Sequence, residues 1–162
     1  IVDDAGTPLP PDGTTIGHLQ VRGATLFDGY LRGGRAVPDL LDGGWYATGD
    51  VATIGPDGWH RIVGRAATDL IKTGGFRVGA GEVEDALLAH PAVREAAVVG
   101  TPHPDLGEQI TAFVVAGRVT ADELIRFVAD RLSGHKRPRQ VHLVPDLPRN
   151  AMGKVQKSRL TG

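Results

Sequence analysis

The sequence predicts an α+β protein in two parts: a β-barrel-like remnant over residues 1–63 and a small second domain after it. Up to residue 63, short β-rich runs alternate with turns rich in Gly and Pro. From residue 81 onward, apolar residues recur at helical spacing in two stretches, and three further runs are β-rich. We therefore expect a β-hairpin, a three-stranded sheet and flanking helices in the second part.

The bulk composition is that of an ordinary globular protein, with 162 residues, 41% hydrophobic and 23% charged. No apolar run reaches the roughly 18 residues of a membrane span, and no signal segment opens the chain, so we expect a cytoplasmic protein without a membrane span. Cysteine is absent, which excludes disulfides and thiolate chemistry. The chain begins at Ile1 rather than Met, and we expect it to be a piece of a longer protein.

The all-β prediction for the first part follows the chain in order. Residues 1–13 are turn-rich, and residues 16–22 carry apolar side chains two apart, as in a strand. Residues 25–31 indicate a loop, and the Gly-rich residues 33–44 an exposed, mobile connection.

The end of the first part indicates a two-stranded meander. Residues 45–50 lead into a strand over residues 51–54, and a Pro-Asp-Gly turn at residues 56–58 leads into a second strand over residues 59–63.

A short hairpin is predicted directly after the first part. Residues 69–72 and 76–78 are compatible with strands, and Thr73, Gly74 and Gly75 supply the turn. Residues 64–68 are mostly small, so the backbone there can change its dihedral angles without breaking a core. We interpret residues 64–68 as a hinge; an ordinary surface turn between two strands is the alternative.

Two helices are predicted between residues 81 and 132. Over residues 81–89, Val83, Leu87 and Leu88 share one face, acidic residues occupy the first turns, and a proline follows the helix. Thr120 and Glu123 form a capping box for a second helix that runs to residue 132. Its buried stripe comprises Leu124, Val128 and Leu132.

The predicted strands of the second part lie between and after these helices. Residues 93–100 and 110–115 should pair antiparallel across a polar turn at residues 101–108. Residues 141–144 indicate a third strand, and residues 154–160 a last helix.

Positive charge is concentrated near the end of the chain. Residues 131–159 hold eight of the eighteen Lys and Arg residues but only one of the nineteen acidic residues. Such a segment favours an anionic partner. A nucleic acid is not expected, because these residues include no Phe, Tyr or Trp to stack on bases.

Two side chains are candidates for ligand chemistry. Asp50 follows a glycine at a predicted strand edge, where a carboxylate can accept two hydrogen bonds from a vicinal diol such as a ribose; a plain turn residue is the alternative. Lys154 lies on a Gly-bearing loop among other bases, where an ammonium can contact a phosphoryl or carboxylate group; a solvated lysine is the alternative. The six histidines show no repeated ligand spacing, so no metal site is predicted.

The order and spacing of several segments carry a resemblance that covers essentially the whole chain. These segments are YATGD, GR, DLIKTGGFRVGAGEVE, HPAVREAAVVGTPHPDLGE, HKRPRQV and PRNAMGK. Together they resemble the C-terminal third of the adenylate-forming enzymes, which comprise acyl-CoA synthetases, adenylation domains of peptide synthetases, and luciferases. The GAGEVE segment and the extra residue in GRAATD are most similar to the bacterial malonyl-CoA or fatty acyl-CoA synthetase branch.

The resemblance implies a two-step reaction. A carboxylic acid and ATP, with Mg²⁺, give an acyl-adenylate and pyrophosphate; the thiol of CoA then displaces AMP. It implies that Asp50 holds the ribose hydroxyls, that Arg65 lies near the nucleotide, and that Lys154 stabilises charge in the first step. It implies that the hairpin turn with Gly74, Gly75 and Phe76 lines the pantetheine channel in the second step. The bases implied to meet CoA phosphates are Lys136, Arg137 and Arg139.

The sequence also departs from the family pattern. The hinge residue of the family is commonly Asp or Lys, whereas Thr68 or Ala67 occupies the matching place here, and Ala80 stands where a Pro is frequent. The phosphate loop, adenine site and acyl pocket of the family belong to an N-terminal region that this sequence does not contain. The resemblance therefore implies that residues 1–63 end that region, that residues 69–162 form a mobile domain, and that the piece alone is inactive.

Two alternatives stay open at this point. One is an adenylation domain that loads a carrier protein instead of CoA. The other is a non-catalytic module of the same fold that binds a partner; the joint presence of Asp50, Arg65 and Lys154 argues against it.

Overall fold

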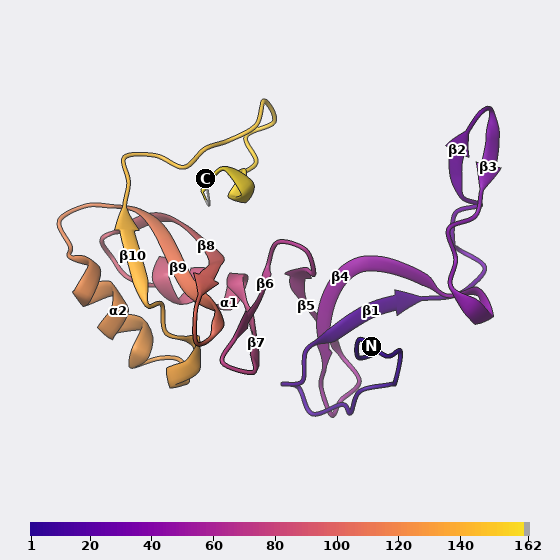
Figure 1. The fold of residues 1–162 in the computed structure, drawn as a ribbon, viewed down its shortest axis with the longest axis horizontal. Helices are drawn as coiled ribbons and strands as arrows, with labels where there is room; N and C mark the ends of the chain where they lie inside the picture. Colours follow the sequence, from indigo (N-terminus) through magenta and orange to yellow (C-terminus); the bar gives the residue numbers. More distant parts are fainter. Residues whose placement is uncertain (161–162) are drawn as a thin grey trace. The chain divides into compact units, whose positions relative to one another are not determined.

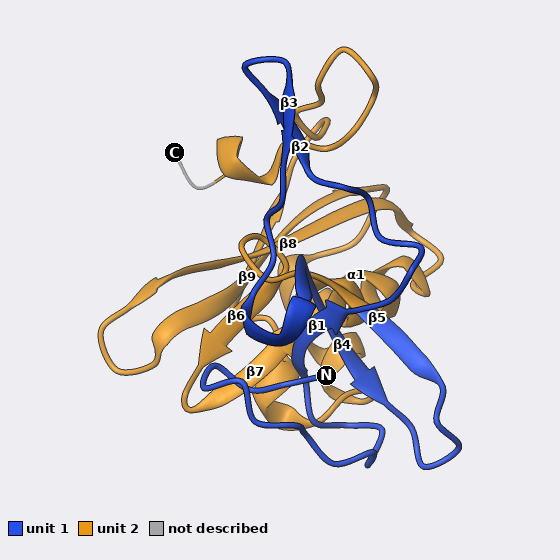
Figure 2. Cartoon of the chain, turned by 90° about the vertical axis from the view of Figure 1, so that its right-hand side faces the viewer, with its two compact units in different colours: residues 1–62 blue, residues 63–162 orange. Residues whose placement is uncertain are grey.

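A computed structural model describes residues 1–160 of the chain (Figure 1). The chain divides into two compact units, with the boundary between Ile62 and Val63 (Figure 2). Both α-helices of the described residues lie in the second unit, and strands dominate the first. The α+β prediction is confirmed.

The first unit is built on a three-stranded sheet, whose last strand runs on past Ile62 into the second unit. Its strands follow in the order β1 (Gly17–Val21), β4 (Tyr46–Ile54) and β5 (His60–Arg65). The predicted turn between β4 and β5 is present, since the N–H of Gly58 donates to the carbonyl of Gly55 at 2.9 Å. The meander prediction is confirmed.

The stretch predicted as a mobile connection begins with a hairpin. Strands β2 (Tyr30–Arg32) and β3 (Arg35–Val37) pair antiparallel, and the 3₁₀ turn η1 (Asp42–Gly44) follows them. Gly33 and Gly34 have φ values of +57° and +79°, which suit a two-residue hairpin turn. The loop predictions for residues 25–31 and 33–44 are thus wrong where these strands form, because the Gly-Gly pair closes a turn.

Strand β4 passes through the YATGD segment without a break, so the prediction that a strand begins only at residue 51 is wrong. Three residues of β4, 48–50, lie opposite the single residue Leu19 of β1, which is a β-bulge. Gly49 takes a φ of +76° within the bulge. The bulge lets the strand continue across the glycine and holds Asp50 inside the sheet.

The second unit contains a five-stranded sheet. Its strands are β6 (Leu70–Thr73), β7 (Phe76–Gly79), β8 (Val93–His103), β9 (Gly107–Ala116) and β10 (Gln140–Leu143), in the order β10–β9–β6–β7 with β8 also paired to β9. The predicted hairpin is confirmed as β6 and β7, but it joins the predicted three-stranded sheet instead of standing apart.

The predicted antiparallel pair is confirmed as β8 and β9, and both strands are longer than expected. The turn between them shrinks from the expected residues 101–108 to residues 104–106. Strand β10 pairs with β9 in parallel, with α2 (Ala121–Ala129) in the connection between them.

Helices α1 (Ala80–Leu88) and α2 lie against one face of this sheet. Leu87 is fully buried, whereas Leu88 is 45% exposed, so its predicted place on the buried face is wrong. The capping box of α2 is confirmed: Thr120 accepts the N–H of Glu123 at 3.3 Å, and the Glu123 carboxylate accepts the N–H of Thr120 at 2.7 Å. The helix ends before Leu132, and this residue packs against the main core from beyond the end of the helix.

The two faces of the β8–β9 pair bury different partners. Val98 and Val114 belong to the main core with the helices, and the neighbouring Ala97 and Val115 belong to a second cluster with Leu147. Val155 and Leu160 of the C-terminal segment pack against this second cluster. The segment from residue 145 to 160 thus covers the face opposite the helices.

The prediction of a last helix over residues 154–160 is wrong. Only the 3₁₀ turn η3 (Lys157–Arg159) forms there. Val155 instead makes a β-bridge with Arg149, and the loop between them turns at Gly153, where φ is +80°. A backbone that must close this loop cannot continue as a helix.

Candidate functional site

Asp50 lies in the β4 bulge at the edge of a hollow in the first unit. The hydroxyl of Thr48 accepts the N–H of Asp50 at 3.0 Å and donates to the carbonyl of Leu19 at 3.0 Å. The half-buried carboxylate borders a hollow of about 390 Å³ that His18 and Leu41 also line. The bulge fixes the backbone that carries Asp50, which suits a group that must accept hydrogen bonds in a set direction.

The residues predicted as a hinge include a hydrogen-bonded turn. The N–H of Asp69 donates to the carbonyl of Arg65 at 2.8 Å, and the Asp69 carboxylate accepts the N–H of Arg65 at 3.0 Å. Gly64 precedes the turn with φ +149°, and a Cβ there would lie 2.6 Å from the Cβ of Asp69. Ala67 and Thr68 are exposed. Asp69 therefore organises the segment around the predicted hinge.

The hairpin turn between β6 and β7 needs both of its glycines. Gly74 and Gly75 have φ values of +56° and +83°, as a two-residue turn with positive φ at both positions requires. Phe76, the next residue, stacks on His135 with ring centroids 4.1 Å apart and planes 14° apart. The stack connects the hairpin to the segment that precedes β10.

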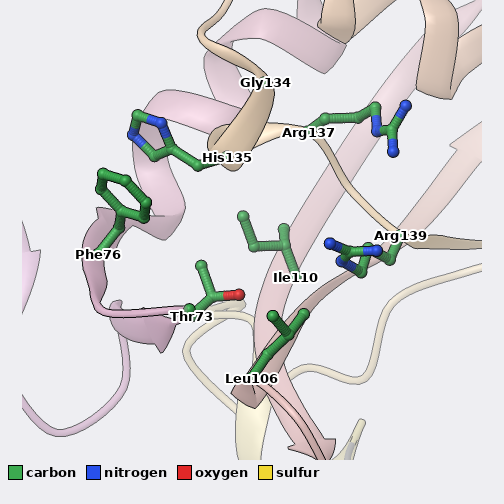
Figure 3. A pocket seen from close by; sticks show the side chains of 9 residues that line it. Thr73, Phe76, Leu106, Ile110, Gly134, His135, Arg137 and Arg139 are labelled. Carbon is green, nitrogen blue, oxygen red and sulfur yellow. The ribbon is translucent and has the colours of Figure 1, made fainter.

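A pocket of about 180 Å³ lies beside this stack (Figure 3). Gly74 and Phe76 line it from the hairpin, and Arg137 and Arg139 from the segment before β10. Its remaining lining residues are Thr73, Leu106, Ile110, Gly134 and His135. A pocket that two arginines and an aromatic stack line together suits a phosphorylated ligand with an apolar part.

Lys136 behaves differently from its two basic neighbours. Its ammonium pairs with the carboxylate of Glu82 on α1 at 2.8 Å, with side chains 26% and 30% exposed. Arg137 and Arg139 line the pocket instead. Of the three bases predicted to meet CoA phosphates, the structure brings two together.

Lys154 lies on an exposed loop that several hydrogen bonds hold together. The side-chain oxygen of Asn150 accepts the N–H groups of Met152 and Lys154 at 3.0 and 2.9 Å, and the N–H of Asn150 donates to the carbonyl of Lys154 at 2.9 Å. Arg149 donates to the carbonyl of Gly153 at 2.6 Å. The backbone is fixed at both ends of the loop, while the lysine side chain faces solvent.

A partly buried charge cluster was missed by the sequence analysis. The ammonium of Lys157 lies 2.6 Å from the Asp69 carboxylate and 2.8 Å from the Glu84 carboxylate, and all three side chains are about one-fifth exposed. These partners are far apart in the sequence, so no local pattern pointed to them. His135 was missed as well, although it stands next to the predicted bases.

No helix among residues 1–160 has the length and apolarity needed to cross a membrane. Within the same residues, no three His, Asp or Glu side chains gather closely enough to hold a metal ion.

Comparison with known proteins finds a family model, curated relatives and solved structures that are similar to this chain. Residues 82–154 match the family model described as AMP-binding enzyme C-terminal domain. A 3-methylmercaptopropionyl-CoA ligase of Ruegeria lacuscaerulensis is 42% identical over 99% of this chain, which covers 30% of that protein.

Solved structures of related enzymes are similar to this chain over nearly its whole length. The ATP-bound MatB of Rhodopseudomonas palustris is 38% identical with a TM-score of 0.82, and the match covers 99% of this chain and 32% of that one. The o-succinylbenzoate CoA synthetase of Bacillus subtilis, in complex with an acyl-adenylate intermediate, is 31% identical with a TM-score of 0.85 and covers 99% and 33%. The chain thus spans about a third or less of the length of the proteins it matches.

Proposed function

Because residues 82–154 belong to the AMP-binding enzyme C-terminal domain family, we propose that the chain is the C-terminal part of an ATP-dependent acyl-CoA synthetase. The complete enzyme would join a carboxylic acid to ATP, releasing pyrophosphate, and then transfer the acyl group from AMP to the thiol of CoA. The observation that carries this proposal is the similarity to a CoA ligase over 99% of the chain, at 42% identity.

Within the first step, three side chains would act on the nucleotide and the acid. The carboxylate of Asp50 would accept hydrogen bonds from the ribose hydroxyls, and Arg65 would lie near the nucleotide. Lys154 would approach the carboxylate and α-phosphate, where an ammonium stabilises the negative charge that develops on the reacting oxygens. The fixed backbone and solvent-facing side chain of Lys154 fit this use. Mg²⁺ would accompany ATP, bound mainly by the preceding part of the enzyme.

The second step would use the hairpin in place of Lys154. Gly74 and Gly75 leave the turn without side chains, so a pantetheine arm can pass close to the backbone, and Phe76 would flank the arm. Arg137 and Arg139 would hold CoA phosphates, with Lys136 contributing less because Glu82 already pairs with it. Residues 64–68 would act as the hinge that exchanges the two arrangements.

Exposed apolar side chains in the first unit support a place within a larger enzyme. Trp59 is 78% exposed, Ile62 56% and Leu31 79%. Further exposed apolar side chains of this unit are Phe27, Tyr30, Val37, Leu40, Leu41 and Trp45. Apolar surface of this extent commonly marks an interaction face, and we propose that the N-terminal domain of the same enzyme covers it.

The experiment is an assay of the complete protein that contains this chain. We expect pyrophosphate release from ATP only when a suitable carboxylic acid is present, and AMP release that requires CoA; the 162-residue chain alone should do neither. AMP release that requires a carrier protein in place of CoA would favour an adenylation domain. The absence of ATP-dependent pyrophosphate release with every acid tested would favour a non-catalytic binding module.

A further inference from the structure

The Lys157 cluster joins three segments of the second unit at one point. Lys157 comes from η3, Asp69 directly precedes β6, and Glu84 lies on α1. The ammonium lies 2.6 Å from Asp69 and 2.8 Å from Glu84, with side-chain exposures of 18%, 21% and 19% for the lysine, aspartate and glutamate. Ion pairs this well shielded from water persist only when the geometry is good and the other lone pairs are satisfied.

The two carboxylates meet that condition through backbone donors. Glu84 accepts the N–H of Val98 on β8 at 2.8 Å, and Asp69 accepts the N–H of Arg65 at 3.0 Å. Burial disfavours the charged form of Lys157, but the hydrogen bonds with Asp69 and Glu84 outweigh it and raise the pKa of the lysine. The ammonium therefore stays charged and anchored between two fixed acceptors.

The segment that Lys157 anchors also carries Lys154, three residues earlier. Besides the ion pair of Arg149 with Glu95, the segment is held by apolar contacts: Leu147 is buried in the second apolar cluster, and Val155 and Leu160 pack against it. After the Lys154 loop, Lys157 is thus the first residue whose side chain ties the segment to the rest of the second unit through ion pairs. Because its ammonium is occupied by two carboxylates, Lys157 itself is not available to a substrate.

We propose that Lys157 is a positioning residue for Lys154, and that its ion pairs with Asp69 and Glu84 hold the Lys154 loop in the geometry that adenylate formation needs. This inference rests on the proposed function for its catalytic consequence. We call the two ion pairs of Lys157 the clamp. One of its carboxylates, Asp69, also closes the turn at the predicted hinge, so the Lys154 loop would move as one body with the start of the second unit.

The structural arm of the test uses hydrogen exchange in the 162-residue chain. The N–H groups of Asn150 and Gln156 are bonded to the carbonyls of Lys154 and Pro148. We expect Lys157→Gln to speed their exchange about tenfold or more while the amides in the middle of β8 and β9 are unchanged. Lys136→Gln is the matched control, because it also removes a lysine from a partly buried pair with a glutamate. Equal exchange in both variants would overturn the clamp.

The catalytic arm uses the complete enzyme and follows the two half-reactions separately. We expect Lys157→Gln to lower kcat of adenylate formation by about 10- to 100-fold, with little change in KM for ATP and with thioester formation from supplied acyl-adenylate retained. Lys157→Arg keeps a cation between the two carboxylates and should retain most of the wild-type rate of adenylate formation.

The outcomes distinguish a failure of the positioning role of Lys157 from a failure of the proposed function. An equal loss in both half-reactions, or a loss in Lys157→Arg as large as in Lys157→Gln, would show a merely structural lysine and overturn the positioning role. A wild-type enzyme that forms no adenylate would count against the proposed function instead, and the exchange experiment would still decide whether the clamp exists.

Discussion

Two adjacent leucines of α1 provide a matched test of the fold. Leu87 is fully buried in the main core, whereas Leu88 is 45% exposed. Replacement by Ala changes the helix propensity equally at both positions, so the difference between the variants reports burial alone. Removing Leu87 also leaves a cavity, and we expect a cost of about 3 kcal/mol, against about 1 kcal/mol for Leu88.

Urea unfolding of the 162-residue chain measures this difference. With a slope of about 1.5 kcal/mol per molar urea, the midpoint should fall by roughly 2 M for Leu87→Ala and by less than about 1 M for Leu88→Ala. Far-ultraviolet circular dichroism follows the second unit, because both α-helices of the described residues lie there. Both tryptophans lie in the first unit, so their fluorescence follows that unit separately.

One result would contradict the burial assigned to these two leucines. Equal midpoint shifts for the two leucines would mean that α1 does not present Leu87 to the core and Leu88 to solvent. The assignment of the helical face, and with it the position of the helix on the sheet, would then be wrong.

The remaining predictions concern the charge cluster, the hairpin and the pocket. Burial acts to raise the pKa of Asp69, but the hydrogen bonds from Lys157 and Arg65 outweigh it and lower that pKa below its ordinary 3.8. The stability advantage of wild type over Asp69→Asn should therefore be full near neutral pH and shrink as the pH falls below about 4. Denaturation at several pH values measures this difference. Gly75→Val should slow thioester formation while adenylate formation persists; Gly58→Val, at a glycine with the same φ of +83° and equally open surroundings, should slow neither. Arg139→Gln should raise KM for CoA about tenfold, and Lys136→Gln should raise it much less.

Local patterns predicted much of this fold. The capping box at Thr120, the Gly74–Gly75 turn and the antiparallel pairing of β8 with β9 each depend on residues close together in sequence, and each is confirmed. The error at Leu88 arose where tertiary contacts decide. Leu88 has the same apolar character as Leu87, and only the place of the sheet distinguishes them.

The candidate site divides in the same way. Gly74, Phe76, Arg137 and Arg139 were each selected from sequence, and the structure adds that they line one pocket. The Lys157 cluster escaped because its ion pair with Asp69 joins residues 88 positions apart, and a charge in a basic segment looks solvated when read alone. Asp50 was expected at a strand edge, but it lies within β4, because the bulge lets the strand continue past Gly49.

The central claim is that Lys154 serves only the first of two steps. The most direct measurement compares the two half-reactions of the complete enzyme after Lys154→Ala. We expect adenylate formation to fall by about 100-fold or more, while thioester formation from supplied acyl-adenylate stays within about threefold of wild type. An equal fall in both half-reactions would contradict the claim.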